Sequence, residues 1–78
     1  MELMDSPFAP VATKVDLETL DLDEIVAGYR DYRRGDPEPG LNRGRAYWHG
    51  WCNRARDDYA MPQTAASAQL AHELYPRR

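Results

Sequence analysis

The sequence is short of the side chains that most enzymes use: among 78 residues it has one cysteine, two histidines and no glycine-rich phosphate loop. A zinc cluster needs a second cysteine, and His49 and His72 are too few and too far apart for a metal site. We therefore expect a protein that is not an enzyme, with no metal site and no cofactor. Because Cys52 has no partner for an internal disulfide bond, the chain fits a reducing compartment.

Cys52 and His49 are the one pair that could act as a nucleophile and its base, because they stand three residues apart on a predicted helix. The helical pattern places Cys52 on the apolar stripe and His49 outside it. We therefore interpret Cys52 as a small core residue, a common role for a free thiol, rather than as a nucleophile.

A long hydrophobic run is also missing. No basic segment followed by an apolar run stands near the start of the sequence, so no signal peptide is predicted. The longest apolar runs are far shorter than the roughly 20 residues that a membrane span needs. We expect a cytoplasmic protein that does not contact a membrane.

The length allows one domain. A domain of this size buries roughly 60% of the surface of its unfolded chain, so its margin of stability is thin. Contact with a partner, or with a second copy, would add burial. We expect a monomer or a homodimer that binds a larger protein complex.

Charge is divided unevenly along the chain, whose net charge is −3. Residues 1–40 carry ten acidic against four basic side chains, a net charge of −6. Residues 41–78 carry six arginines against three acids, a net charge of +3. The overall acidity argues against a general nucleic-acid binder. A surface divided in this way either serves solubility alone or steers the docking of a partner.

The hydrophobic pattern predicts an all-α fold, with an extended acidic arm followed by a small three-helix domain. The arm covers residues 1–20 and the helical domain residues 21–78. The three helices are predicted at about 22–34, 42–60 and 63–75. Within the arm, side chains alternate over residues 13–19, so a short strand there is the alternative.

Local signals place the helix ends. Asp21 or Asp23 can cap the first helix. Gly35 can provide its left-handed stop. Asn42 is a plausible cap for the second helix, and Thr64 stands near the start of the third.

Trp48 and Trp51 are the largest apolar side chains, and both lie on the apolar stripe of the second helix. We interpret them as core residues, and the alternative is a pair of stacking platforms for nucleic-acid bases. Their expected neighbours are three side chains of the first helix: Ile25, Val26 and Tyr29.

Two charged faces are candidate partner-binding sites. The first is a basic stripe on the second helix: Arg45, His49 and Arg56. The second is an acidic face whose carboxylates could occupy a groove built for phosphates: Asp16, Glu18, Asp21, Glu24 and Asp31. For both faces the alternative is an ordinary solvated surface. A third surface, a candidate dimer seam, is a ridge of short side chains: Ala46, Gly50, Asn53 and Asp57.

Residues 28–58 carry a pattern of Gly-Tyr, a later glycine, a proline-containing connector and Arg-x-x-Trp-x-Gly-Trp. The stretch resembles the ribosome modulation factor family of small bacterial proteins. The matching positions are Gly28, Tyr29, Gly35, Arg45, Trp48, Gly50, Trp51, Ala55 and Asp58. The resemblance implies a two-helix unit that binds ribosomal RNA and silences ribosomes. The chain departs from that family in its acidity, its acidic arm and its third helix, so the scaffold can be shared while the partner differs.

In overall character the sequence also resembles the accessory proteins of phages and prophages, among them anti-CRISPR proteins. Those proteins bind a CRISPR effector complex and block its access to DNA. No single residue carries over, but this resemblance accounts for the acidity better than ribosome binding does. It implies a small non-enzymatic inhibitor of a CRISPR effector complex in the cytoplasm of a bacterial host cell, with ribosomal RNA as the alternative partner.

Overall fold

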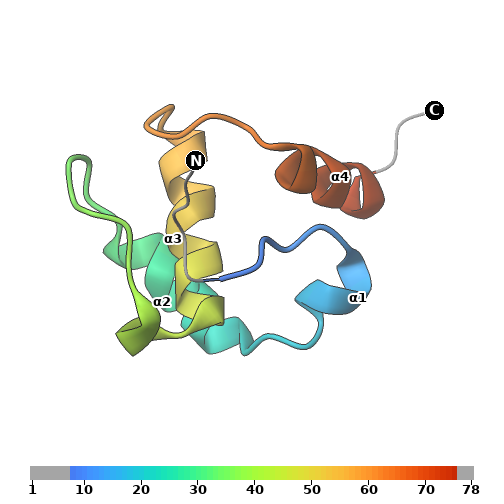
Figure 1. Ribbon diagram of the computed structural model, residues 1–78, viewed down its shortest axis with the longest axis horizontal. Coiled ribbons are helices and arrows are strands. Elements are labelled where there is room, and N and C mark those ends of the chain that lie inside the picture. The colour runs from blue at the N-terminus through green and yellow to red at the C-terminus, as the bar shows by residue number, and fades with distance from the viewer. Residues whose placement is uncertain (1–7, 76–78) are drawn as a thin grey trace.

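The computed structural model describes residues 8–75, which form helices and loops without a strand (Figure 1). In chain order the elements are α1 (Lys14–Leu17), α2 (Leu22–Asp31), the 3-10 turn η1 (Leu41–Arg43), α3 (Arg45–Asp57) and α4 (Ala65–Leu74). The all-α prediction is confirmed, and α2, α3 and α4 stand in the places of the three predicted helices. Residues 1–7 of the predicted arm lie outside the described part.

The extended arm is wrong over residues 14–17, where the chain forms the short helix α1, and the alternative strand over 13–19 is wrong as well. The Thr13 hydroxyl accepts a hydrogen bond from the Asp16 amide at 3.1 Å and so caps the first turn. A strand needs a neighbour, and residues 8–75 contain no other strand to pair with. The turn satisfies its backbone groups locally, which an unpaired strand cannot do.

α2 begins where it was predicted and ends earlier. A carboxylate oxygen of Asp21 accepts a hydrogen bond from the Asp23 amide at 2.9 Å, as a helix cap should. At the other end Tyr32 leaves the helical conformation, with ψ of 136°, and its ring turns into the core. Gly35 does have a positive φ, 94°, but it lies in the turn beyond the helix. The predicted end at residue 34 is therefore too late.

The starts of α3 and α4 differ in how they are capped. Asn42 lies within η1 rather than at the cap of α3, where Gly44 stands with φ of 84° and makes no side-chain hydrogen bond. Thr64 caps α4 in a reciprocal pair: its hydroxyl accepts from the Ser67 amide at 3.1 Å, and the Ser67 hydroxyl accepts from the Thr64 amide at 2.9 Å.

α2 and α3 cross at a pair of glycines. A Cβ atom on Gly28 would overlap the carbonyl oxygen of Tyr47, and one on Gly50 would overlap the carbonyl oxygen of Ile25. The two backbones can approach this closely because neither residue has a side chain. Gly50 therefore faces α2 inside the molecule, so the predicted dimer seam is wrong at this position.

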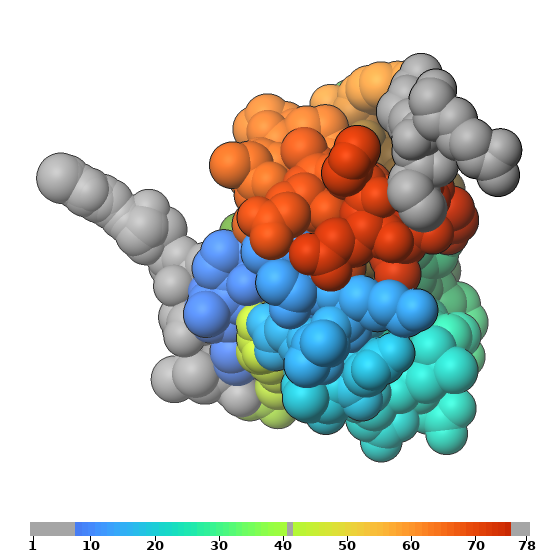
Figure 2. Space-filling model, turned by 90° about the vertical axis from the view of Figure 1, so that its right-hand side faces the viewer, coloured from blue at the N-terminus to red at the C-terminus, as the bar shows by residue number. Residues whose placement is uncertain are grey.

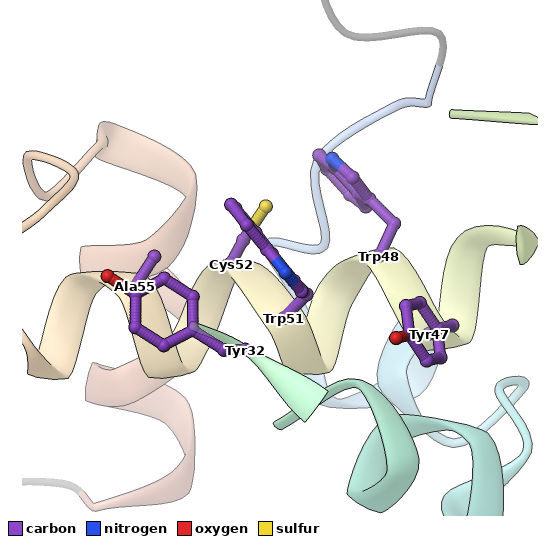
Figure 3. Close-up of a cluster of buried hydrophobic side chains, with 6 residues drawn as sticks. All are labelled: Tyr32, Tyr47, Trp48, Trp51, Cys52 and Ala55. Carbon is purple, nitrogen blue, oxygen red and sulfur yellow. The ribbon is translucent and has the colours of Figure 1, made fainter. Parts of the chain in front are cut away.

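The core lies along α3 (Figure 3). Trp48 and Trp51 are both buried, which confirms their interpretation as core residues. The ring of Trp51 meets that of Tyr32 edge to face, with centroids 5.1 Å apart. The ring centroid of Trp48 lies 5.5 Å from that of Phe8, in the part of the chain before α2 (residues 8–20) that we call the N-terminal segment. The expected neighbours Val26 and Tyr29 are instead 52% and 41% exposed. The early end of α2 explains this change, because it turns Tyr32 onto Trp51.

α4 lies against the segment that contains α1, on the face shown in Figure 2. Leu70 is the buried residue of this helix. A carboxylate oxygen of Glu73 accepts a hydrogen bond from the Lys14 amide at 2.7 Å, which joins α4 to α1. α4 is thus a cover placed beside α3 rather than a third member of the core.

Candidate functional site

Arg45, the first member of the predicted basic stripe, holds the N-terminal segment onto α3. Its guanidinium donates to both carboxylate oxygens of Asp16, at 2.6 and 2.8 Å, and to the carbonyl oxygen of Ala9 at 2.9 Å. The hydrogen bond from Arg45 lowers the pKa of Asp16, and the same contact raises the pKa of Arg45. Because the guanidinium donors of Arg45 are occupied by this bidentate ion pair, they are not free to bind a partner.

His49, the second member, is 5% exposed, so the expectation that it lies outside the buried face is wrong. Its Nε2 atom lies 3.2 Å from the side-chain amide nitrogen of Asn53. Burial, together with the positive charges of Arg56 and Arg45, lowers the pKa of His49 to about 4. The imidazole is therefore neutral near pH 7 and adds no charge to the stripe.

Arg56, the third member, is half-buried. The structure does bring these three side chains near one another on α3, since both arginines influence His49. Arg45 is bound to the N-terminal segment, however, and His49 and Arg56 line a cleft beside α4 rather than an open surface. Cys52, beside them, is almost fully buried, and burial raises the pKa of its thiol to about 12, which leaves it unreactive as a nucleophile.

The carboxylates of the predicted acidic face are likewise engaged within the protein or lie apart from one another. Asp16 is paired with Arg45, and Asp21 caps α2. Asp31 stands at the opposite end of α2, where it accepts a hydrogen bond from the Tyr47 hydroxyl at 2.9 Å. That hydrogen bond, with a further one from Arg30, lowers the pKa of Asp31. The exposed carboxylates that remain together form an acidic corner around the start of α2: Glu18, Asp21, Asp23 and Glu24.

Tyrosine–aspartate hydrogen bonds join α2 to α3, a feature that sequence reasoning missed. The Tyr29 hydroxyl donates to Asp57 at 2.6 Å, and the Tyr32 hydroxyl donates to Asp58 at 3.0 Å. Asp57 raises the pKa of Tyr29, and burial, with Asp58, raises that of Tyr32. The signal was present in the sequence, because tyrosines on one predicted stripe and aspartates near the end of the next helix can meet across an antiparallel pair.

Arginines surround the C-terminal half of α2. Arg43 lies over the ring of Tyr47, 3.8 Å from its centroid. Arg54 lies 5.7 Å from the ring of Tyr29 and 5.9 Å from that of Tyr32. Three more arginines follow one another at the end of the helix and are exposed. We call these five residues the arginine collar: Arg30, Arg33, Arg34, Arg43 and Arg54.

The collar is partly neutralised by its own carboxylates. Arg34 donates to Asp58 at 2.8 Å, which lowers the pKa of that carboxyl, and Arg30 lies 3.4 Å from Asp31. Within the described residues Arg33 donates only to backbone carbonyl oxygens, and Arg43 and Arg54 lie beside tyrosine rings. The collar therefore keeps a positive surface, at the other end of α2 from the acidic corner.

Residues 8–75 contain no group of three or more His, Cys, Asp or Glu side chains placed to hold a metal ion. No helix among them has both the length and the apolar character that a membrane span requires.

The motif residues of the resemblance fall mainly on the packing of α2 against α3. Gly28 and Gly50 form the crossing, Trp48 and Trp51 lie in the core, and Ala55 is completely buried. The pattern therefore describes a scaffold more than a binding surface. In comparisons with known proteins, no family model matches the chain, and no curated protein and no solved structure matches it.

Proposed function

We propose that this chain is a non-catalytic RNA-binding protein of the ribosome-modulator kind, and that it docks on RNA through the arginine collar. One observation carries the proposal: five arginines gather around the exposed end of α2, where Arg43 is stacked on the ring of Tyr47 and Arg54 lies within 5.9 Å of two further tyrosine rings. Because most of the rest of the chain is acidic, the collar is the surface best suited to a phosphate backbone.

The stacking supports this proposal because it prepares the guanidinium groups for binding. A guanidinium that lies on a ring has fewer conformations to lose, and its edge donors still point outward toward phosphate oxygens. The half-exposed ring of Tyr29 offers a face on which an unpaired base can stack, as RNA-binding proteins commonly provide. The arginines can therefore bind phosphates while the tyrosine ring stacks on a base.

The separation of charge supports the same orientation. The acidic corner lies at the N-terminal end of α2 and the collar at its C-terminal end, so RNA is repelled from one and attracted to the other. The protein would then bind RNA in one orientation and would avoid general nucleic-acid binding, in line with its net charge of −3. The resemblance of residues 28–58 to the ribosome modulation factor family implies the same partner.

The test is co-sedimentation with purified bacterial ribosomes at two salt concentrations. The double variant Arg43→Gln/Arg54→Gln should lose about tenfold or more in affinity, because charge-assisted hydrogen bonds to phosphate are removed. The matched control is Glu18→Gln/Glu24→Gln in the acidic corner, which should bind at least as well as the parent. Binding that is unchanged in the collar variant contradicts the proposal.

A second candidate function is favoured by the acidic corner: a small inhibitor that occupies the DNA groove of a CRISPR effector complex. Glu18 and Glu24 are exposed and lie among four carboxylates near the start of α2. Effector channels are lined with lysine and arginine, so these carboxylates would take the place of phosphates. Glu18→Lys/Glu24→Lys should then abolish inhibition of target-DNA binding, while the collar variant should inhibit normally. The reverse pattern argues against this candidate.

A further inference from the structure

A cleft of about 310 Å³ lies between α3 and α4, and the N-terminal segment lines one of its sides. The residues that matter for its chemistry come from all three parts of the chain: Val11, Trp48, Arg56, Ser67, Leu70 and Leu74. This volume is at the lower end of the range for small-molecule sites. The cleft exists because α4 stands beside α3 rather than packing into it.

The α3 side of the cleft carries a positive charge without a counter-ion. Within residues 8–75 no carboxylate lies in ion-pair distance of Arg56, and its side chain makes one hydrogen bond, of 3.4 Å, to the side-chain carbonyl oxygen of Asn53. Its Nε atom is buried with no hydrogen-bond partner among those residues. A half-buried guanidinium in this state is costly unless an acceptor arrives.

The other groups that face this charge do not compensate for it. His49 lines the cleft and is neutral near pH 7. Asp57 also lines it and keeps its negative charge, but its carboxylate forms no ion pair with Arg56 and instead accepts the short hydrogen bond from the Tyr29 hydroxyl. The α3 side is therefore set up to receive a negative group.

The α4 side adds donors of the same kind. Three residues at the start of α4 line the cleft: Thr64, Ala66 and Ser67. Thr64 and Ser67 cap each other, while the amide of Ala66 has no acceptor within residues 8–75. Free amides at the N-terminus of a ten-residue helix favour a negative group nearby.

We propose that this cleft binds a small organic anion, with its carboxylate or phosphate held between Arg56 and the first turn of α4 and its apolar body against Leu70 and Leu74. Two independent features line the same space: a guanidinium without a carboxylate partner among residues 8–75, and the first turn of α4. The apolar side chains along the rest of the cleft distinguish such a ligand from a bare ion. Tyr29 borders both this cleft and the collar, but none of the five collar arginines lines the cleft, so anion binding does not depend on the proposed RNA binding.

The binding test uses phenyl phosphate and benzoate as probes, followed by the tryptophan fluorescence, to which Trp48 in the cleft contributes, and by the NMR signals of His49. An anion beside the imidazole favours its protonated form, so bound probe should raise the pKa of His49 from about 4. Inorganic phosphate should bind at least about tenfold more weakly than phenyl phosphate, because it leaves the apolar side of the cleft empty. Equal binding of the two, or no binding of any organic probe at millimolar concentration, overturns the proposal. Comparison of phenyl phosphate with benzoate identifies the preferred head group.

The matched variants are Arg56→Gln and Arg54→Gln, which change neighbouring arginines of the same helix. Arg56→Gln should weaken probe binding by about tenfold or more, and Arg56→Lys should keep part of it. Arg54→Gln should bind the probe normally but lose affinity for ribosomes, and Arg56→Gln should do the opposite. The melting temperature of each variant shows that it is folded. Unchanged probe binding by a folded Arg56→Gln protein contradicts the site even if the RNA proposal holds.

Discussion

The α2–α3 pair and α4 are attached to the molecule by different means. α2 and α3 meet backbone to backbone at Gly28 and Gly50 and share a core of aromatic rings along α3. α4 buries Leu70 and is joined to α1 by the hydrogen bond from the Lys14 amide to Glu73. Elements with few buried apolar contacts open at lower free energy than those in the core. The pair should therefore carry most of the stability, while α4 acts as a cover that can open by itself.

The largest expected effect comes from the core of the pair. Trp51→Ala removes a buried indole that packs edge to face on Tyr32, and it should cost about 3–5 kcal/mol in the free energy of unfolding. Since small domains have about 5–15 kcal/mol in total, this change can unfold the protein. Chemical denaturation measures the loss. Tyr59→Ala, at a residue that is 91% exposed, is the control and should melt like the parent. A Trp51→Ala protein as stable as that control would contradict this account of the core.

The next effect is a loss of stability at low pH. It arises from His49, which lies between the α2–α3 pair and α4. His49 has its pKa lowered from 6.5 to about 4 by burial and by Arg56 and Arg45, with Asp16 acting in the opposite direction. A histidine held neutral in the folded state stabilises it fully above pH 6.5, and this contribution is lost as the pH falls toward 4. The loss should reach roughly 3 kcal/mol.

Denaturation at several pH values between 7 and 4.5 measures this loss. The pKa values of Asp16, Asp31 and Asp58 are also lowered in the folded state, so their contributions are lost only below about pH 4, outside that window. His49→Gln, which keeps a polar side chain beside Asn53, should make the stability nearly independent of pH in the window. A parent curve as flat as that of the variant would mean that His49 is not held neutral by burial.

A third prediction tests the glycine crossing. Gly50→Ala places a methyl group against the carbonyl oxygen of Ile25, so the helices must separate, at a cost of about 1–3 kcal/mol. Gly40→Ala is the matched control, because a Cβ there meets its nearest atom, Asn42 Oδ1, at an ordinary 3.7 Å. Thermal melting of both variants measures the difference. If both melt alike, the close approach of α2 and α3 does not need Gly50.

These differences follow what the sequence could and could not predict. Caps were predictable at Asp21 and Thr64, because the groups that meet there are two or three residues apart. The burial of Trp48 and Trp51 followed from the apolar stripe on which they stand. The same helical pattern placed His49 outside the buried face, because a pattern identifies a side of a helix and not what covers it. The cover consists of α4 and the N-terminal segment, which are distant in sequence.

The candidate site was harder to predict for the same reason. Asp16 and Arg45 were assigned to opposite charged faces, and the fold pairs them with each other. The collar joins arginines from the end of α2, from η1 and from α3, so no single helix shows it. The free charge of Arg56 depends on which carboxylates fail to reach it, which requires the packing of every neighbouring element. Hydrogen bonds between residues that are close in the sequence can be predicted from it, whereas ion pairs between distant residues depend on the whole fold.

The smallest effect on global stability should come from Leu70→Ala in the cover. A buried leucine in a rigid core costs about 2–5 kcal/mol when it is cut to alanine. Here the loss is limited by the free energy at which α4 opens, because once the helix is released no further contact of Leu70 remains to be lost. We therefore expect a global loss of about 1 kcal/mol or less, together with fast hydrogen exchange of the α4 amides and slow exchange in α3. Gln69→Ala, on the exposed side of the same helix, should leave exchange in α4 unchanged. A loss of about 2–5 kcal/mol, with hydrogen exchange becoming faster in α3 and α4 together, would instead mean that α4 and the α2–α3 pair unfold as one cooperative unit.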